Sequence, residues 1–592
     1  MKPYASHALL ALLILSLAAP AWGLPPKEEW IELRSPSFTL SSNATERKAQ
    51  ALAADLERLR DVLQQLSPGI ALSSPVPSYL FVFKGPDSFL PYQKTYNGQP
   101  LKSDGYFLAR PFANFVAVNG DAQGHEREVL YHEYIHYVMR NNFATLPLWL
   151  HEGLAEYYST FDAGKAEARI GVAVPEHVRW LRDHPLIPLA TLFAVKEDSP
   201  EYNEASRRGA FYSESWVLVH YLISGNAERR QQALEFLRLA QAGTPPEQLF
   251  QKAFGADPAV LERELRSYIK SYIFASSRVA VRPQAAVAIE ERPLAWPDVL
   301  SRLGDLLANL GDEHRAAAEE HFQAALQAQP EHASALAGLG FLRESADRPA
   351  EARLFYERAA RLAPEDFRIQ YLYARSLLED PGDDSLRQAR SALARVVKIR
   401  PDFGEAWASL GYSYQSEETL DAGAVQALET AHRLLPSRLD VAHNLAMAYV
   451  RTGRPAQAQE LIDRVLVPGK AEPELIDNVR EALLDEEQNR AESLLEEQKL
   501  EEAVAMLESL RGKTSHADRR DALAARIEEI RLAQDFNRFV ELYNQAVELV
   551  NRGNVRGAVA ILEPLAKSAR NPGQAEQART LLQRLQPPRK RK

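Results

Sequence analysis

Cysteine is absent from the 592 residues, so the chain forms no disulfide and offers no thiol for a lipid anchor. After the first 23 residues the sequence also lacks an apolar run long enough to span a bilayer. An excess of basic residues is missing as well: the formal net charge of −10 argues against a nucleic-acid partner, and the basic tail at 587–592 is short. These absences leave a globular protein, 46% hydrophobic and 25% charged, that is long enough for at least two domains.

The first 23 residues have the pattern of a secretory signal peptide. Lys2 supplies the positive end, Ala8 to Ala19 form an apolar run too short to cross a membrane, and Ala21-Trp22-Gly23 resembles a small-x-small cleavage site. We therefore predict a mature chain that begins near Leu24. A secreted chain of this size without cysteine fits a bacterial periplasm.

The segment from Tyr131 to Tyr158 contains the pattern H-E-x-x-H, with His132 and His136 spaced by four residues and Glu133 after the first. On a helix, this spacing places two imidazoles on one face with a carboxylate beside them, as in zinc hydrolases. The apolar periodicity predicts a helix from about Glu126, and a second helix that begins near Pro147. A catalytic zinc ion takes three protein ligands and leaves a position for water, so a third ligand must come from elsewhere in the chain.

The string from Leu148 to Ala155, LWLHEGLA, resembles the W-L-x-E-G-x-A signature of the gluzincin metallopeptidases, the thermolysin-like and aminopeptidase-like families. The resemblance implies that Glu152 is the third ligand of a single Zn²⁺ ion. It also implies that Glu156, one turn later, orients a ligating histidine. The G-x-M-E-N element of the aminopeptidases is missing from 111–121. An exopeptidase that acts on free amino termini is therefore disfavoured, and an endopeptidase or a specialised amidohydrolase is left.

The same resemblance gives two residues catalytic roles. Glu133 takes the proton of the metal-bound water and passes it to the leaving amine. Tyr212 lies 60 residues after Glu152, at the predicted start of an apolar helix, and would stabilise the oxyanion; an ordinary aromatic core residue is the alternative. The roles of His151 and His220 are left open.

Residues 24–275 are expected to form one α+β catalytic domain of the thermolysin-like, gluzincin type. Asn43 and Glu46 are predicted to cap a helix that runs to about Leu66. By resemblance, the strand Phe115, Val116, Ala117, Val118 and Asn119 is the sheet edge along which a substrate peptide pairs; a plain core strand is the alternative.

A stretch without periodicity, 276–296, predicts a linker, and the sequence beyond it repeats. Pro330, Pro364, Pro401, Pro436 and Pro468 recur at steps of 34, 37, 35 and 32, close to the tetratricopeptide period of about 34 residues. We predict an all-α solenoid of about five tetratricopeptide repeats over 297–468, followed by degenerate helical repeats over 469–586.

The combined patterns predict a periplasmic zinc metallopeptidase whose repeat array recruits a protein or peptide substrate or a protein partner. Two other interpretations stay open. One is a binding scaffold for envelope assembly in which the metal domain has lost turnover, and the other is a zinc amidase that acts on cell-wall peptides.

Overall fold

The computed structural model describes residues 23–585, apart from 75, 97–98, 102, 123, 144–145, 165–166, 204, 242–243, 245, 256–257, 272, 282–286, 380–381, 415–421 and 569. Almost all of the predicted signal peptide and the whole basic tail therefore lie outside the described residues. The chain divides into two compact units: the first runs to Ser416 and includes Gln426–Ser437, and the second contains 417–425 and everything from Arg438 onward.

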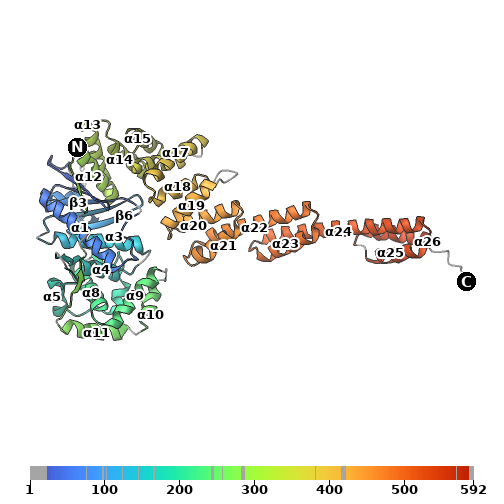
Figure 1. The fold of residues 1–592 in the computed structure, drawn as a ribbon, viewed down its shortest axis with the longest axis horizontal. Helices are drawn as coiled ribbons and strands as arrows, with labels where there is room; N and C mark the ends of the chain where they lie inside the picture. Colours follow the sequence, from blue (N-terminus) through green and yellow to red (C-terminus); the bar gives the residue numbers. More distant parts are fainter. Residues whose placement is uncertain are drawn as a thin grey trace, which may run out of the picture. The chain divides into compact units, whose positions relative to one another are not determined.

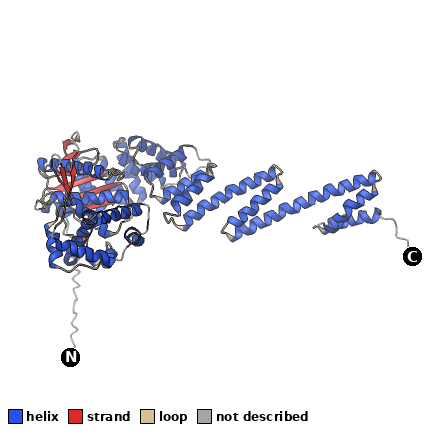
Figure 2. Ribbon diagram, turned by 60° about the horizontal axis from the view of Figure 1, so that its bottom comes forward, coloured by secondary structure: helices blue, strands red, loops and turns tan. Residues whose placement is uncertain are grey.

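The first unit is built around a mixed six-stranded sheet in the order β11-β1-β2-β3-β7-β6 (Figures 1 and 2). Strand β1 pairs antiparallel with β11 and β2, the β2–β3 and β3–β7 pairs are parallel, and β6 pairs antiparallel with β7. The strands are β1 (Ile31–Arg34), β2 (Thr39–Ser42), β3 (Ser78–Phe83), β6 (Gly105–Arg110), β7 (Ala113–Asn119) and β11 (Glu290–Pro293). Short strands outside this sheet are β4 (Thr95–Tyr96), β5 (Gln99–Pro100), β8 (Asp162–Ala163), β9 (Glu167–Ile170) and β10 (Ser277–Ala280).

Both faces of the sheet are buried, which explains why its central strands are continuously apolar. Leu80 and Val82 of β3 belong to the core shared with helices α1 (Glu46–Leu66) and α3 (Glu126–Asn142). Phe81 and Phe83 alternate with them and pack into a second core, which includes helix α12 (Trp296–Leu310). The sheet therefore lies between the α1–α3 layer and the first repeat helices (Figure 1).

Helix α1 begins later than predicted, and the proposed capping pair is wrong. Thr45 occupies the N-cap position and makes no side-chain capping hydrogen bond. Asn43 instead donates to Glu28 Oε1 at 2.6 Å and accepts the backbone N–H of Lys84 at 2.7 Å. This residue therefore ties the start of the chain to the end of β3.

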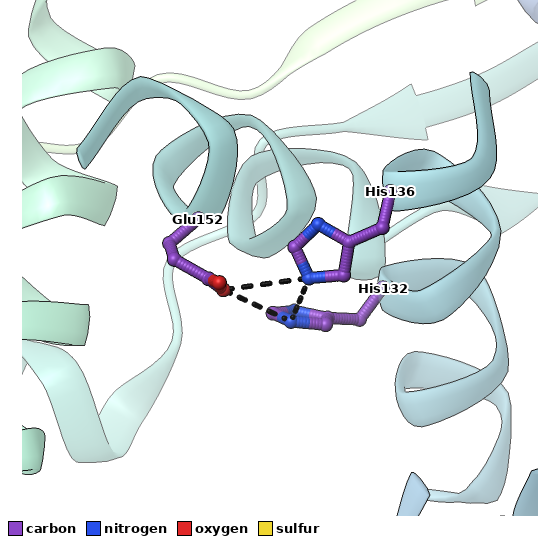
Figure 3. A group of neighbouring side chains, drawn as sticks. All are labelled: His132, His136 and Glu152. Atoms are coloured by element: carbon purple, nitrogen blue, oxygen red, sulfur yellow. Dashed lines mark hydrogen bonds and ion pairs between the residues drawn. The ribbon is translucent and has the colours of Figure 1, made fainter. Parts of the chain in front are cut away.

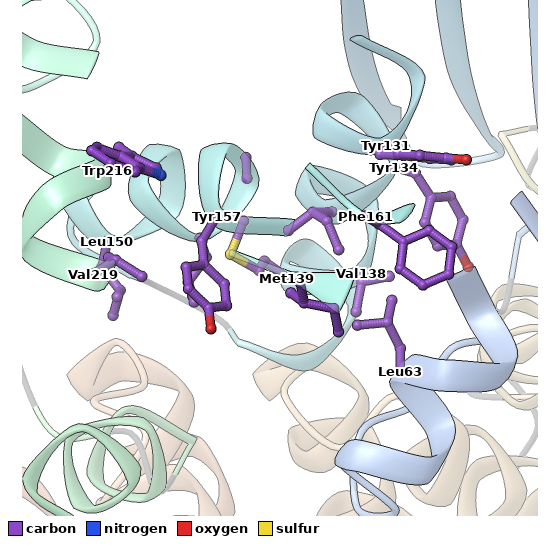
Figure 4. Packing of buried hydrophobic residues seen from close by; sticks show 14 of the residues in the cluster. Leu63, Tyr131, Tyr134, Val138, Met139, Leu150, Tyr157, Phe161, Trp216 and Val219 are labelled. Carbon is purple, nitrogen blue, oxygen red and sulfur yellow. The ribbon is translucent and has the colours of Figure 1, made fainter. Parts of the chain in front are cut away.

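The remaining helices before β10 lie on both sides of the sheet, with α2 and η1 in the core shared with α12. Helix α3 and helix α4 (Leu148–Ser159) begin and end close to the predicted positions, and Val138, Met139, Leu150 and Tyr157 fill the core between them and their neighbours (Figure 4). The others are α2 (Pro86–Phe89), η1 (Leu90–Tyr92), α5 (Pro175–Asp183), α6 (Leu189–Ala194), α7 (Pro200–Asn203), α8 (Ala205–Ser224), α9 (Ala227–Gln241), α10 (Pro246–Phe254) and α11 (Pro258–Ser271).

The stretch expected to be a linker, 276–296, contains strands β10 and β11, and β11 completes the main sheet beside β1. Glu32 of β1 is fully buried and binds residues of β11 and α12 to the sheet. Its Oε1 accepts hydrogen bonds from Arg34 at 2.6 Å and Arg292 at 2.7 Å, and its other oxygen pairs with Arg302 of α12. The first repeat is therefore fastened to the sheet by a buried carboxylate, and the first unit does not end at 275 but continues through the first repeats.

The repeats of the first unit form helical hairpins in which consecutive helices pack antiparallel. Small residues permit close contact, as at Gly340, which lies against the ring of Tyr356. The helices after α12 are η2 (Asp312–His314), α13 (Arg315–Ala328), α14 (Ala333–Ser345), α15 (Pro349–Leu362), α16 (Phe367–Leu378), α17 (Asp383–Ile399), α18 (Gly404–Tyr412) and α19 (Ala422–Leu434).

The second unit is all-helical. It contains α20 (Leu439–Arg451), α21 (Pro455–Leu461), the π-helical turn η3 (Ile462–Leu466), α22 (Pro473–Glu496), α23 (Leu500–Lys513), α24 (Ala517–Asn551), α25 (Val555–Ser568) and α26 (Pro572–Leu585). Helix α24 has two separate cores along its length, one with α22 and α23 and one with α25 and α26. Within the described part of the chain, none of the helices combines the length and the hydropathy needed to cross a membrane.

Candidate metal centre

Helices α3 and α4 bring the three predicted ligands together. The Nε2 atoms of His132 and His136 lie 3.0 Å apart, and Glu152 Oε2 lies 3.4 Å from each of them. The three side chains converge on one point from two helices (Figure 3). The four-residue spacing on α3 sets the first pair, but only the packing of α4 on α3 brings the carboxylate to them.

This triangle has the dimensions of a zinc site. Two ligand atoms about 2.0–2.1 Å from a tetrahedral ion lie about 3.3 Å apart. Glu152 Oε2 is buried and has no hydrogen-bond partner among the described residues, although it faces two imidazole nitrogens. An unsatisfied buried carboxylate oxygen is costly, and a divalent cation would satisfy it. His132, His136 and Glu152 therefore fit the donor set of a catalytic zinc ion.

The electrostatics of the site favour a cation beside Glu152. Burial disfavours a charged imidazole at His132, but the close contact with the Glu152 carboxylate and the charges of Glu156 and Glu133 outweigh this effect and raise the pKa of His132 to about 10. Burial alone would raise the pKa of Glu152, yet the neighbouring His136 and His132 hold this pKa well below its ordinary value. The site therefore stabilises a buried anion that is surrounded by positive charge.

Glu156 lies next to a ligand, as predicted, and has a second partner that the sequence did not reveal. Its Oε1 is 3.5 Å from His132 Nδ1, and its Oε2 is 3.1 Å from Nε2 of His177 in α5. The other nitrogen of His177 lies 3.0 Å from Ser213 Oγ in α8. The chain of contacts from Ser213 to His132 fixes the orientation of the ligand ring. His177 lies in the short helix α5, which carries no metal-site motif, so no local pattern identified it.

Two tyrosines reach the metal centre where one was predicted. Tyr202 in α7 donates a hydrogen bond from its phenol to Glu152 Oε1 at 3.0 Å, so it holds the carboxylate by the oxygen that faces away from the histidines. Tyr212 forms a hydrogen bond with Tyr202, and its ring lies 6.3 Å from that of His132. Burial, reinforced by Glu152, raises the pKa of both phenols, so both stay protonated. Tyr212 stands in the second turn of α8, not at its start.

The two other histidines have distinct environments. The ring of His151 stacks on that of His136, with centroids 4.5 Å apart and planes 9° apart. Burial and the charge of His136 lower the pKa of His151 to about 3. His220 is fully buried, and its ring nitrogens contact Tyr268 Oη at 2.8 Å and the Gly171 carbonyl at 2.9 Å. His220 is thus a satisfied core residue that does not line the cleft described below.

Gly153 of the W-L-x-E-G string permits the approach of α8 to α4. A Cβ atom at this position would lie 2.4 Å from the Ser215 carbonyl oxygen and 2.5 Å from Val219 Cγ2. Only glycine leaves room for this contact. The residue next to the ligand Glu152 therefore sets the distance between the helices that carry Glu152 and Tyr212.

The strand predicted to be the substrate edge, Phe115 to Asn119, is not an edge strand. It belongs to β7, which lies between β3 and β6, and all of its residues are buried. The core-strand alternative is therefore correct. The edge of the sheet near the metal centre is β6, which packs on α3 and lines the cleft in front of the metal ligands.

The register of β6 shows which of its backbone groups face outward. Asn119 N–H donates to the Asp104 carbonyl, so residues 104, 106, 108 and 110 bond to β7 in the antiparallel pattern. The N–H and C=O groups of Gly105, Phe107 and Ala109 therefore point to the open edge.

The cleft has a volume of about 970 Å³. It is bounded by β6, by the helices α3 and α4, and by residues from the stretch between α6 and α8. Its lining includes the three ligands together with Lys94, Asp104, Arg110, Glu128, Glu133, Arg140, His151, Glu156, His177, Glu197, Tyr202 and Tyr212.

Comparisons with known proteins identify the repeats and leave the half that carries the candidate metal centre without an assigned activity. Two tetratricopeptide repeat families match residues 301–380 and 422–475. Residues 129–245, which contain the metal ligands, match a family described as a protein of unknown function (DUF1570). No curated protein matches the chain. The prediction of tetratricopeptide repeats is thus confirmed, whereas the peptidase assignment stays a prediction.

Similar solved structures come from repeat proteins. YrrB, titled a TPR protein with an unusual peptide-binding site, is 20% identical and is matched over 31% of this chain and 90% of its own, with a TM-score of 0.27. MamA from Desulfovibrio magneticus RS-1 is 18% identical over 30% of this chain and 97% of its own, with a TM-score of 0.26. A thermophilic TPR protein from Thermus thermophilus, TTC0263, is 21% identical over 32% of this chain and 99% of its own, with a TM-score of 0.24.

Proposed function

We propose that the chain is a zinc-dependent peptidase of the gluzincin type, in which His132, His136 and Glu152 hold one zinc ion. The observation that carries the proposal is the triangle of two imidazole nitrogens and one carboxylate oxygen, with sides of 3.0, 3.4 and 3.4 Å, in the wall of an open cleft. A bound zinc ion would act as a Lewis acid and lower the pKa of a bound water.

The surrounding side chains supply the other parts of a hydrolytic site. Glu133 lines the cleft and follows the ligand His132, so its carboxylate would accept a proton from the attacking water and return it to the leaving amine. Tyr212 stays protonated and lines the same cleft, so its phenol would donate to the oxygen that becomes negative. Tyr202 and Glu156 would keep Glu152 and His132 in place.

The open edge of β6 supports an extended peptide as the substrate. The outward N–H and C=O groups of Gly105, Phe107 and Ala109 lie along this edge, and those that no side chain occupies offer a template on which a peptide would add as a further strand. Pairing of this kind recognises the backbone of the peptide, so it suits an endopeptidase. A specialised amidase on cell-wall peptides would use the same metal site, and sequence preference on peptide libraries separates the two.

The tetratricopeptide repeats support a role in binding a protein partner or substrate. In the first unit, helices α12 and α16 already contact the half that carries the candidate metal centre: the Asn309 carbonyl accepts from Arg110, and the Arg368 guanidinium lies over the Tyr79 ring. We therefore propose that a partner binds to repeat surfaces outside this contact.

The predicted signal peptide supports export to a bacterial periplasm, which N-terminal sequencing of the mature protein would check.

The test combines metal analysis with a trapping variant. We expect one equivalent of zinc in the purified mature protein and turnover of denatured protein substrates. Glu133→Gln should retain zinc, abolish turnover and retain bound substrate. Glu126→Gln lies on the same helix, where Glu126 pairs with Lys48 away from the cleft, and should stay active. Stoichiometric zinc without cleavage would favour the scaffold interpretation, and absence of zinc at neutral pH would overturn the proposal.

A further inference from the structure

Lys94 places an ammonium group at the open edge of β6. It follows η1, lines the cleft, and donates from Nζ to the Phe107 carbonyl oxygen at 3.1 Å. Its Nζ also lies 5.3 Å from the centre of the Tyr106 ring. The side chain is therefore held in place by the strand that would receive a substrate.

The contact changes what the edge of the sheet can bind. The Phe107 carbonyl is one of the outward-facing acceptors of β6, and Lys94 occupies it. A peptide that pairs with β6 cannot place an N–H on this oxygen without displacing the lysine. An ammonium group has three N–H donors, of which the Phe107 carbonyl takes one. At this point of the edge, an incoming chain therefore meets hydrogen-bond donors and a positive charge where a sheet would normally offer an acceptor.

The surroundings of Lys94 fit an anion that arrives with the substrate. Burial lowers the pKa of Lys94, and the charges of Glu133, Glu197 and Glu152 oppose this effect. Of these, Glu152 is assigned to the metal and Glu133 to the proton transfer. A carboxylate carried by the substrate would add a further anion beside this partly buried cation.

The other two cations in the cleft wall are placed differently. Arg110 donates from Nε and Nη2 to the Asn309 carbonyl of α12 at 3.0 and 2.5 Å, so its guanidinium is engaged away from the metal ligands. Arg140 is exposed in the last turn of α3, one turn after His136. Of these three, Lys94 is bonded to the Phe107 carbonyl in the middle of the open edge, whereas Arg110 reaches only the carbonyl of its neighbour Ala109, from Nη1 at 3.5 Å.

We propose that Lys94 binds a carboxylate of the substrate and makes the enzyme select peptides that present an acidic group where pairing with β6 stops. The carboxylate is either the C-terminus of the peptide or an Asp or Glu side chain. This inference rests on the proposed peptidase function and adds a substrate class to it.

The experiment measures peptide binding to the zinc-loaded full chain carrying Glu133→Gln, so that the readout does not depend on turnover. A peptide cleaved by the wild type is compared with its C-terminal amide, and each Glu or Asp in it is replaced by Gln or Asn. We expect one of these neutral forms to bind at least about tenfold more weakly than the acidic form. The form that loses affinity identifies the carboxylate.

Lys94→Met in the same background should reduce binding of the acidic form to that of the neutral form, and Lys94→Arg should restore part of the difference. Lys252→Met, on α10 away from the cleft, is the matched control and should change nothing. Equal binding of acidic and neutral peptides by the Glu133→Gln chain with Lys94 intact would overturn the inference, even if Lys94→Met failed to fold. A preference that is lost in Arg140→Met but kept in Lys94→Met would also overturn it. A chain that lacks zinc or cleaves no peptide refutes the peptidase proposal, which is a separate outcome.

Discussion

The ring of Phe112, at the turn between β6 and β7, lies against the ring of Tyr371 in α16, with centroids 5.4 Å apart. The guanidinium of Arg375, from the same repeat helix, lies 4.5 Å from the centre of the Phe112 ring. The hairpin whose outer strand borders the metal cleft thus ends inside the tetratricopeptide helices. The half that carries His132, His136 and Glu152 and the first repeats therefore form one compact unit.

This contact predicts that the repeats stabilise the hairpin. Phe112→Ala should lower the free energy of unfolding by about 1–3 kcal/mol, because a half-buried ring and a cation–π contact are lost. Denaturant titration of the full chain measures the effect. Phe536→Ala removes a ring that is 54% exposed on α24 and should change stability by less than about 0.5 kcal/mol. Equal losses in the two variants would show that the Phe112 contact contributes nothing.

The close approach of α4 and α8 predicts that Gly153 cannot be enlarged. Gly153→Ala would place a methyl group 2.4 Å from the Ser215 carbonyl oxygen, so the helices must move apart and shift Glu152. We expect a loss of about 1–3 kcal/mol in stability together with a lower zinc content. Gly512 of α23 has open space around the corresponding position, so Gly512→Ala should leave both unchanged or slightly raise stability. A stable Gly153→Ala variant with full zinc content would contradict the assigned packing.

The hydrogen bond from Tyr202 to Glu152 predicts a role in metal affinity. Tyr202→Phe leaves Glu152 Oε1, the oxygen that faces away from the histidines, without this donor, and we expect zinc affinity to fall about tenfold. Competition with a chelator at neutral pH measures it. Tyr221→Phe removes a comparable phenol hydrogen bond, to Glu264, and should leave zinc affinity unchanged. If both variants hold zinc as the wild type does, Tyr202 does not position the ligand.

Glu214 predicts a pH dependence of stability. Its carboxyl is buried and accepts the Ile187 N–H at 2.8 and 3.0 Å, and burial raises its pKa to about 8 from 4.5. The folded protein therefore holds this proton more tightly than the unfolded chain. The contribution of this proton to the free energy of unfolding is complete below pH 4.5. It decreases between pH 4.5 and about 8, by at most about 1.4 kcal/mol per pH unit.

Glu214→Gln keeps an acceptor for Ile187 but does not titrate, so its stability relative to the wild type should increase between pH 5 and pH 8. Urea titrations at both pH values measure the difference. Glu228→Gln, at an exposed position in the first turn of α9, should follow the wild type at both pH values. A constant difference between Glu214→Gln and the wild type would refute the predicted titration.

The local patterns predicted well those features that depend on a few neighbouring residues. The four-residue spacing of His132 and His136, the helix beginning at Glu126 and the repeat period around Pro330 and Pro364 all arise from the geometry of a single helix or hairpin. The prediction that Asn43 caps a helix is wrong because its partner, the Lys84 backbone, is remote in sequence. Tyr202 and His177 were not identified because the short helices α7 and α5 carry no motif that points to the site.

The sequence by itself determined the spacing of His132 and His136 on α3 and the tetratricopeptide register, because these follow from helical periodicity. Only the tertiary structure decided that β6 and not β7 is the sheet edge, that Lys94 occupies its Phe107 carbonyl, and that Glu32 fastens the first repeat to the sheet. Strand order and buried ion pairs depend on contacts between segments far apart in the chain. Apolar strands that are buried on both faces look alike in sequence, wherever they lie in the sheet.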